Sequence, residues 1–295
     1  MAQKSSVTVV IDPGHGGDDP GHLSHNSSHL PEKDLNLKIA KYLGSYMEKY
    51  LQNVKVIYTR TGDTYPSLDE RVSKANNINA DYFISIHCNG NDRKSVRGTE
   101  THVHNMSLTK SVSLAKAIEK QFSSRAGRKS RGVKDERDLQ HSLQVLKYTN
   151  MPSVLVECGF MTNTKEANYL NSTYGQEILA SAIFRAFRGT IEDRYPQIAF
   201  RRTTPNTNTT TTVASTPVND ASKYTIQIAS SKKPLKTDDY YFKKSGMAVT
   251  RKELNTTSAY KYIYTVGNYS SRSEAKAALK KVKEKGYNDA IVIKS

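Results

Sequence analysis

The sequence predicts an α/β protein: a mostly parallel sheet with helices on both faces, followed by a small βαββαβ module that forms an α/β sandwich. In the first part of the chain, short apolar runs alternate with segments whose apolar residues recur at helical spacing. Residues 203–222 are rich in Thr, Asn and Pro and have almost nothing to bury, which is typical of a flexible tether. Beyond this stretch the order of the elements changes. The predicted parts are therefore a domain at 5–200, a linker at 203–222 and a module at 223–295.

The N-terminal domain contains strand-like and helix-like segments in alternation. The expected strands cover residues 7–12, 54–58, 82–87 and 154–157, and the expected helices cover 35–51, 68–77, 108–122 and 176–187. Strands that are separated by helices pair in parallel, because each crossover returns the chain to the same edge of the sheet. We therefore expect a mostly parallel sheet whose two faces are covered by helices.

The C-terminal module has a different rhythm. Its expected order is strand, helix, strand, strand, helix, strand, at residues 224–229, 236–244, 248–252, 260–266, 272–285 and 289–293. The second helix is the best marked, because Ser271 and Glu274 have the spacing of a capping box and Gly286 follows its last turn. This order predicts a sandwich with one open sheet face.

Charge is unevenly distributed along the 295 residues. Only 36% of the residues are hydrophobic, and no run approaches the roughly 18–20 apolar residues that span a bilayer. The formal net charge is +16, and the segment from Lys223 to the C-terminus alone holds 16 Lys and Arg against 6 Asp and Glu, a net of +10. This excess predicts an anionic polymer as the partner of the module. Nucleic acid, teichoic acid and peptidoglycan all satisfy the charge criterion.

Two further features concern the cellular setting. The apolar run at residues 7–11 is too short for the core of a signal peptide and no cleavage site precedes the fold, so no signal peptide is visible. Cys88 and Cys158 are the only cysteines, which excludes a disulfide framework. Each lies at the end of an expected buried strand, and two buried free thiols are favoured over a disulfide.

Three polar motifs follow the carboxyl ends of expected strands. They are Asp-Pro-Gly-His-Gly-Gly at 12–17, Ser-Ile-His-Cys-Asn at 85–89 and Val-Leu-Val-Glu-Cys-Gly-Phe at 154–160. In open α/β sheets this edge is where sites are built. Two histidines and a glutamate with an open fourth position form the ligand set of a hydrolytic zinc site, for which His15, Glu32 and His87 are the candidates. Glu157 is then available as a general base.

Each of these residues also has a purely structural interpretation. A histidine after a Gly-rich turn is often a surface residue, and His87 and Glu157 could be satisfied polar groups at strand ends. Their joint occurrence at three strand ends favours a site, although spacing alone leaves the reaction undetermined. His22, His25 and His29 lie between two candidate ligands, where they either contact substrate or belong to a solvated loop.

A longer series of motifs supports a family assignment. The segments are 10–17, 32–37, 58–63, 68–71 with 75–76, 84–89, 98–100, 131–134 and 156–163. With these segments, residues 7–190 resemble the zinc-dependent N-acetylmuramoyl-L-alanine amidases of the amidase-3 family. The resemblance implies zinc held by His15, Glu32 and His87, catalysis by Glu157, and cleavage of the amide that joins the lactyl group of N-acetylmuramic acid to L-alanine. Arg71 and Asn89, which lie in these motifs, are predicted to contact the substrate.

The resemblance also bears on mechanism and regulation. Zinc would lower the pKa of a water molecule and polarise the lactyl carbonyl, while Glu157 would pass the proton to the leaving amine. Some family members carry a long helical insertion that blocks the site. Residues 101–130 have room for only one strand and one helix, so the resemblance implies an uninhibited enzyme. Residues 135–144 are expected to form a surface excursion near the groove.

The C-terminal module resembles a SPOR domain. The motifs that carry this resemblance are 224–230, 264–272 with 274–275, and 290–293. Such domains bind glycan strands stripped of stem peptides, and the resemblance places Gln227 and Ser230 on the exposed sheet face. These two residues and Tyr262 are predicted to bind glycan. Tyrosines alternate at 260, 262 and 264, where they could stack on bases, stack on sugars or pack beneath the helices.

The sequence thus predicts a zinc amidase whose partners are peptidoglycan and its peptide-stripped strands, with no nucleic acid and no membrane span. It would act at the cell wall or in the periplasm, as a monomer or as cargo of a larger delivery assembly. A trimmed signal, phage-type lysis or an injection apparatus could bring it there. The alternatives are another zinc-dependent wall hydrolase, such as a carboxypeptidase or deacetylase, and a non-catalytic wall-binding protein.

Overall fold

The computed structural model describes residues 4–201 and, further on, 224–231, 233–237, 242, 245–254, 261–285, 287 and 290–294. The chain divides into two compact units, which we describe separately. The predicted linker at 203–222 and most of the helix expected at 236–244 lie outside the described residues. The boundaries 5–200, 203–222 and 223–295 therefore stay predictions.

The first unit is built on a six-stranded mixed sheet in the order β2-β1-β3-β6-β4-β5. Its strands are β1 (Val7–Pro13), β2 (Val54–Tyr58), β3 (Tyr82–Asn89), β4 (Thr99–His102), β5 (Ser130–Lys134) and β6 (Ser153–Phe160). All neighbours pair in parallel except β4, which runs antiparallel to β6. The expectation of a mostly parallel sheet is confirmed, and β5 is a strand that the sequence patterns did not indicate.

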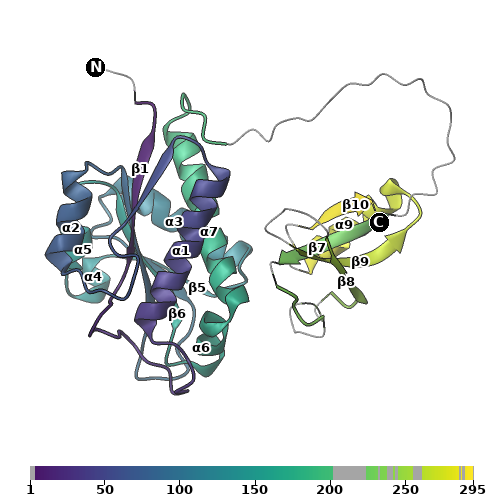
Figure 1. Cartoon of the computed structure of the whole chain (residues 1–295), viewed down its shortest axis with the longest axis horizontal. Helices are drawn as coiled ribbons and strands as arrows, with labels where there is room; N and C mark the ends of the chain where they lie inside the picture. Colours follow the sequence, from purple (N-terminus) through teal and green to yellow (C-terminus); the bar gives the residue numbers. More distant parts are fainter. Residues whose placement is uncertain are drawn as a thin grey trace. The chain divides into compact units, whose positions relative to one another are not determined.

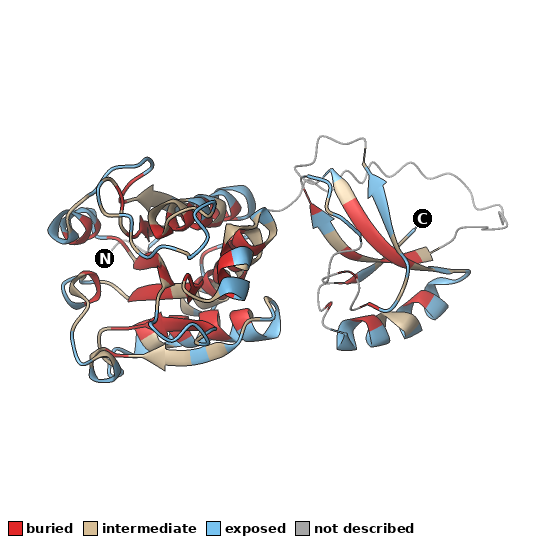
Figure 2. Ribbon diagram, turned by 90° about the horizontal axis from the view of Figure 1, so that it is seen from below, coloured by how far each residue is buried: buried red, intermediate tan, exposed pale blue. Residues whose placement is uncertain are grey.

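Helices cover both faces of this sheet (Figure 1). One face packs against α1 (Glu32–Tyr50), α3 (Thr109–Ser124) and α7 (Thr173–Arg194), and the other against α2 (Leu68–Asn77) and α5 (Gln144–Lys147). Two shorter helices are α4 (Glu136–Leu139) and α6 (Thr164–Asn171). The central strands are buried on both sides: Val9 and Ile11 belong to the larger core and Val10 to the smaller one (Figure 2). No helix among the described residues is long and apolar enough to cross a bilayer.

The strand register brings chemically active residues to one edge of the sheet. Strands β1, β3 and β6 all end there, with Pro13 beside Ile86 and His87 beside Glu157. Because β4 is antiparallel, it begins at that edge, and its Glu100 lies directly opposite Glu157. The carboxyl edge therefore gathers side chains from four strands.

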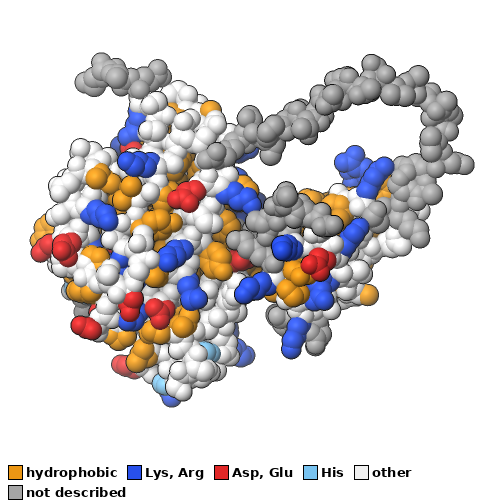
Figure 3. All heavy atoms as spheres, in the orientation of Figure 1, with side chains coloured by type: hydrophobic (Ala, Val, Ile, Leu, Met, Phe, Trp, Pro, Cys, Tyr) orange, Lys and Arg blue, Asp and Glu red, His pale blue; other side chains and the backbone are white. Residues whose placement is uncertain are grey.

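The second unit is a four-stranded antiparallel sheet in the order β10-β7-β9-β8, with helix α9 on one face (Figure 2). The elements are β7 (Tyr224–Ser231), β8 (Val249–Glu253), β9 (Tyr262–Tyr269), α9 (Arg272–Glu284) and β10 (Ile291–Lys294). The strands and the second helix agree with the predicted order. Basic side chains predominate over acidic ones on the visible face of this unit (Figure 3).

Candidate metal centre

A tight turn after β1 delivers the first histidine to the sheet edge. A Cβ on Gly14 would lie 2.1 Å from the ring of His87, so glycine is required for the two segments to meet. His15 itself has a left-handed backbone, with φ of 61°, a conformation that costs a non-glycine residue about 1 kcal/mol. Its carbonyl oxygen accepts a hydrogen bond of 2.8 Å from Nη2 of Arg71, which helps to hold this conformation. The imidazole rings of His15 and His87 come to 4.9 Å, centroid to centroid.

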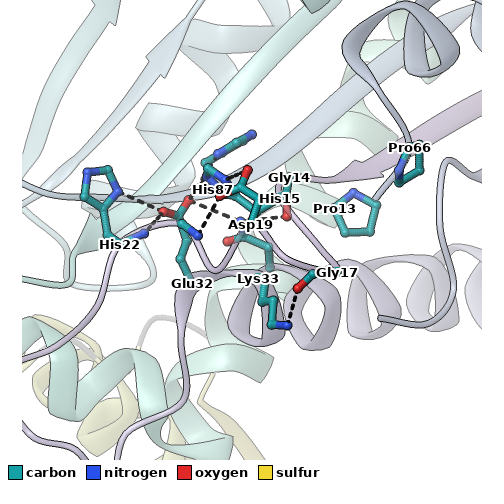
Figure 4. Close-up of polar contacts among 12 residues, drawn as sticks. Pro13, Gly14, His15, Gly17, Asp19, His22, Glu32, Lys33, Pro66 and His87 are labelled. Atoms are coloured by element: carbon teal, nitrogen blue, oxygen red, sulfur yellow. Dashed lines mark hydrogen bonds and ion pairs between the residues drawn. The ribbon is translucent and has the colours of Figure 1, made fainter. Parts of the chain in front are cut away.

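The third predicted ligand, Glu32, completes the group (Figure 4). It is the first residue of α1 and is almost completely buried. Its Oε1 lies 3.2 Å from Nε2 of His15 and 3.1 Å from Nδ1 of His87, and one ligand atom from each of the three residues lies within 4.8 Å of the others. Burial works to raise the pKa of Glu32, but its hydrogen bonds with these histidines and with His22 hold the pKa well below its usual range. An ionised carboxylate together with two imidazoles is a suitable donor set for zinc.

A second layer of contacts fixes the orientation of these groups. Asp19 Oδ2 lies 2.7 Å from Nδ1 of His15, which leaves Nε2 for Glu32 or a metal ion. The backbone N–H of Cys88 donates to Oε1 of Glu32 at 2.9 Å, and Asn36 Nδ2 donates to the same oxygen at 3.2 Å. The sequence patterns did not indicate Asp19 or Asn36 as part of the site. Their only signal was a carboxylate four residues after His15 and an amide four residues after Glu32, spacings too common to single out.

The loop histidine His22 also belongs to this layer. Its backbone N–H and its Nδ1 both lie 2.8 Å from Oε2 of Glu32. His22 is therefore a partner of the buried carboxylate, a role that neither expected alternative, substrate contact or solvated loop, included. Figure 4 shows His22 on one side of Glu32 and the two candidate ligands His15 and His87 on the other.

Glu157 lies beside His87 on the neighbouring strand. Its Oε2 is buried and has no hydrogen-bond partner among the described residues. Burial, reinforced by the negative charges of Glu32 and Glu100, raises the pKa of Glu157 well above its usual range. A carboxyl with a raised pKa binds a proton more readily than an ordinary glutamate, which suits a group that transfers protons in general acid–base catalysis.

The pKa of the neighbouring carboxylate, Glu100, shifts in the opposite direction. Its Oε1 accepts from Asn89 Nδ2 at 2.9 Å and lies 3.3 Å from Nε2 of His102, and its Oε2 accepts from Arg131 Nε at 2.7 Å. Burial alone would raise its pKa, but these bonds lower the pKa to about 2. Two adjacent glutamates with separated pKa values are a common arrangement in acid–base sites. Asn89 is half-buried and already engaged with Glu100, and its predicted contact with substrate stays a prediction.

The predicted substrate contact by Arg71 is wrong. Its side chain is 2% exposed and its Nη1 donates to Asp12 Oδ1 at 2.7 Å and to the carbonyl of Pro13 at 2.8 Å. Arg71 supplies the cation that the buried Asp12 carboxylate requires, and it also donates a hydrogen bond to the carbonyl oxygen of His15. Arg71 therefore holds the turn that contains His15 in place.

Both cysteines are buried and free, as predicted. Burial raises the pKa of the Cys88 thiol and of the Cys158 thiol well above the usual range. Neither thiol is therefore a reactive group at neutral pH.

In the second unit, alternation along the strands separates the predicted glycan contacts. Gln227 is half-buried and lies between the core residues Ile226 and Ile228, so it faces the open side of the sheet, and Ser230 is exposed. Tyr262 instead packs against the core on the helix side, and its hydroxyl donates to Glu253 Oε1 at 3.2 Å. The structure therefore favours packing over the predicted glycan contact for Tyr262, which lies on the other face of the sheet from Gln227.

Tyr264, two residues further along β9, lies on the same side of the sheet as Tyr262. Tyr264 is fully buried and stacks on Phe242 at 4.7 Å, so packing beneath the helix is the correct interpretation for this residue. Tyr260 lies outside the described residues.

Comparisons with known proteins agree with this geometry. A family model described as N-acetylmuramoyl-L-alanine amidase matches residues 9–188, and a SPOR domain model matches residues 220–294. The N-acetylmuramoyl-L-alanine amidase LytC of Bacillus subtilis (strain 168) is 38% identical over 177 residues, which cover 60% of this chain and 34% of LytC. The sporulation-specific N-acetylmuramoyl-L-alanine amidase of the same organism is 32% identical over 167 residues, 57% of this chain and 61% of that protein. The chain thus spans about a third of the length of LytC.

Solved structures match over the same region. An N-acetylmuramoyl-L-alanine amidase from Clostridium difficile 630 aligns with a TM-score of 0.60 and 36% identity, covering 64% of this chain and 99% of that one. The amidase AmiC2 of Nostoc punctiforme aligns with a TM-score of 0.57 and 33% identity, again over 64% and 99%. Since the first family model covers more than half of its residues, the chain belongs to the Amidase_3 family of N-acetylmuramoyl-L-alanine amidases and carries a C-terminal SPOR domain.

Proposed function

We propose that this protein hydrolyses the amide between the lactyl group of N-acetylmuramic acid and the L-alanine of the stem peptide, with zinc held by His15, Glu32 and His87. The observation that carries the proposal is the convergence of these three residues within 4.8 Å beside Glu157, whose buried Oε2 has no described partner. The names of the matched relatives and solved structures support the choice of this amide.

The donor set fits a hydrolytic zinc ion. Two imidazoles and one carboxylate are a common protein ligand set for zinc that leaves one position open. His15 would offer Nε2, because Asp19 occupies its Nδ1, and His87 would offer the Nδ1 that faces Glu32. When bound, zinc supplies Lewis acidity that polarises the carbonyl and lowers the pKa of a water molecule.

Glu157 would transfer the proton during hydrolysis. Its raised pKa allows it to accept a proton as the amide is attacked and to deliver it to the departing amine of L-alanine. Glu100, held ionised by His102 and Arg131, keeps a negative charge beside Glu157 that raises the pKa of Glu157 further. The same carboxyl therefore serves as base and then as acid.

The SPOR domain would retain the enzyme on the wall. Hydrolysis leaves a free lactyl carboxylate on each stripped sugar, so the product strand is anionic and matches the +10 charge of residues 223–295. Gln227 and Ser230 would contact this strand from the open sheet face. The protein would thus act at the cell wall and bind its own product.

The catalytic assignment can be tested with a Glu157→Ala variant on a suspension of purified cell walls. Removing a general base typically slows a reaction by about 10²–10⁴-fold, while the zinc content should stay at that of the wild type because Glu157 is not a proposed ligand. Glu48→Gln, an exposed change on α1, is the control and should keep full activity. His15→Ala should lose both zinc and activity. A Glu157→Ala protein that still clears walls at the wild-type rate would refute the mechanism.

A further inference from the structure

The side chains at the carboxyl edge of the sheet divide between its two faces, and Glu157 points to the face that α2 and α5 cover. Along β6, Val156 and Cys158 belong to the larger core, whereas Leu155 belongs to the smaller core beneath α2 and α5. Alternation therefore places Glu157 on the same face as Leu155. Glu100 shares this face, because it lies directly opposite Glu157 on an antiparallel strand.

Two cations of β5, the strand at the edge of the sheet, lie beside Glu100. Nε of Arg131 donates to Oε2 of Glu100 at 2.7 Å, and Nζ of Lys134 lies 3.8 Å from the same oxygen. Directly opposite residues of an antiparallel pair, such as Glu100 and Glu157, have Cβ atoms about 5 Å apart. The two cations therefore lie one to two strand spacings, roughly 5–10 Å, from Glu157 and on its side of the sheet.

Arg131 is held in place but keeps donors for a ligand. Its guanidinium carbon lies 5.2 Å from the centre of the Phe160 ring, and its Nε is engaged by Glu100. Its Nη1 and Nη2 form no hydrogen bond with the described residues. The Arg131 side chain is 31% exposed and that of Lys134 is 29% exposed, so both reach solvent. A fixed guanidinium whose outer nitrogen atoms are available is well suited to bind a carboxylate.

The charges at this position do not cancel. Arg131 and Lys134 contribute two positive charges, whereas Glu100 contributes one negative charge. Glu157 adds no negative charge while it holds a proton, a state that its surroundings favour. His102, the buried neighbour of Glu100, adds none either. One cation is sufficient to pair with Glu100, so the second positive charge is available to an anionic group of the substrate.

The order of the strands indicates which part of the substrate reaches these cations. His15 follows β1 and His87 belongs to β3, whereas β4 and β5 lie on the other side of β6, the strand of Glu157. In the proposed function Glu157 gives its proton to the departing amine, so the peptide half of the substrate lies on the Glu157 side of the metal centre. The peptide would then extend toward β4 and β5, and the sugar toward β1 and β2.

We propose that Arg131 and Lys134 bind a carboxylate of the stem peptide, on the leaving side of the amide that is cut. The inference rests on the proposed function. In the uncut substrate the lactyl carboxyl is part of the amide, so the acidic groups near the bond belong to the peptide. The residue after L-alanine carries such a group, and the roughly 5–10 Å between Glu157 and the cations matches about two residues of an extended peptide. Guanidinium and ammonium groups bind a carboxylate through charge-assisted hydrogen bonds.

The test uses two muramoyl peptides that differ at one group: the α-carboxyl of the D-glutamate that follows L-alanine is free in one and amidated in the other. Cleavage of each is measured as kcat/KM for the full chain and for three single variants. Arg131→Gln removes the guanidinium, and Lys134→Gln removes the second cation but leaves the bond between Arg131 and Glu100 in place. The control is Lys116→Gln, which removes an exposed lysine from α3, a helix that covers the other face of the sheet.

The wild type and the Lys116→Gln control should cleave the acidic substrate about tenfold better than the amidated one, the size of a single charge-assisted contact. In Arg131→Gln the two rates should come within about twofold of each other, and in Lys134→Gln the preference should fall by about threefold or more. A purely structural role of Arg131, in holding Glu100, would instead slow both reactions equally and leave the preference unchanged.

An absent preference in the wild type, or a wild-type preference in both variants, would overturn the inference. If Arg131→Gln does not fold, the result for Lys134→Gln decides between the two outcomes. Cleavage of neither substrate at the muramoyl–alanine bond would refute the proposed function, and the inference with it.

Discussion

Asp19 lies four positions after His15, and the contact between their side chains decides which nitrogen of the imidazole faces the proposed metal. With Nδ1 held at 2.7 Å by the Asp19 carboxylate, the ring presents Nε2 to Glu32. Carboxylates in this position fix the tautomer of a ligand histidine and make it a better donor. Asp19 is therefore a positioning residue for the site.

An Asp19→Asn variant tests this role. We expect zinc affinity to fall by about 10–100-fold, because the amide cannot stabilise the oriented imidazole as the carboxylate does. Competition with a chelator of known affinity measures the change, and Asp18→Asn, at an exposed neighbouring position, is the control. Equal affinities for both variants and the wild type would remove Asp19 from the account.

At the scale of elements, the antiparallel pairing of β4 with β6 sets Glu100 directly opposite Glu157. The two carboxyls have different surroundings. Glu100 forms hydrogen bonds with Asn89, His102 and Arg131, whereas Oε2 of Glu157 has no hydrogen-bond partner among the described residues. The strand pairing thus creates one ionised and one proton-binding carboxyl at adjacent positions.

This arrangement predicts a pH dependence of stability. The pKa of Glu100 falls from an ordinary value of 4.5 to about 2 in the folded protein. Its ionised form therefore stabilises the fold fully above the unfolded pKa, and this contribution is lost as the pH falls through the range between the two values. The free energy of unfolding of the wild type should exceed that of Glu100→Gln by on the order of 1–3 kcal/mol near pH 6, and by much less near pH 3. Urea denaturation at both pH values measures the difference, and a gap that is independent of pH would contradict the prediction.

The elements also show what the sequence could and could not predict. The apolar runs at β1, β3 and β6 predict strands correctly, because strands buried on both faces need continuous apolar residues. Strand β5, with the sequence Ser-Arg-Gly-Val-Lys, lacks this signal since it lies at the edge of the sheet. The helix expected at 176–187 extends over Thr173–Arg194, because Ser172 caps its N-terminus.

The site shows the same division. His15, His87 and Glu157 could be predicted from motifs at strand ends, and Glu32 from the segment 32–37 that belongs to the family resemblance. The structure brings His15, Glu32 and His87 together beside Glu157. Arg71 was misassigned because a sequence motif does not reveal burial, and only the fold shows that its guanidinium lies beneath the turn of His15.

At the scale of the whole molecule, two units with different chemistry share one chain. The first holds the proposed catalytic group, and the second offers a basic sheet with Gln227 on its open face. An enzyme that creates carboxylates and a basic module that binds them would concentrate activity where cutting has begun.

The module can be examined in the full chain without turnover, by using the Glu157→Ala background. We expect this protein to bind wall material stripped of stem peptides more tightly than intact walls, with binding that weakens as salt rises. Adding Gln227→Ala should weaken binding to the stripped material several-fold, whereas adding Lys276→Ala, on the helix side of the module, should change it little. Co-sedimentation measures both, and equal binding to the two materials would refute product recognition.

The proposed function depends on which bond is cut and on whether cleavage requires a metal ion. Mass spectrometry of purified peptidoglycan digested by the full chain tests it, with and without a chelator and after zinc is restored. We expect intact stem peptides with a free N-terminal L-alanine and sugars with a free lactyl carboxylate, both abolished by the chelator and recovered with zinc. Shortened stem peptides still attached to muramic acid, deacetylated sugars, or the same products in the presence of chelator would contradict it.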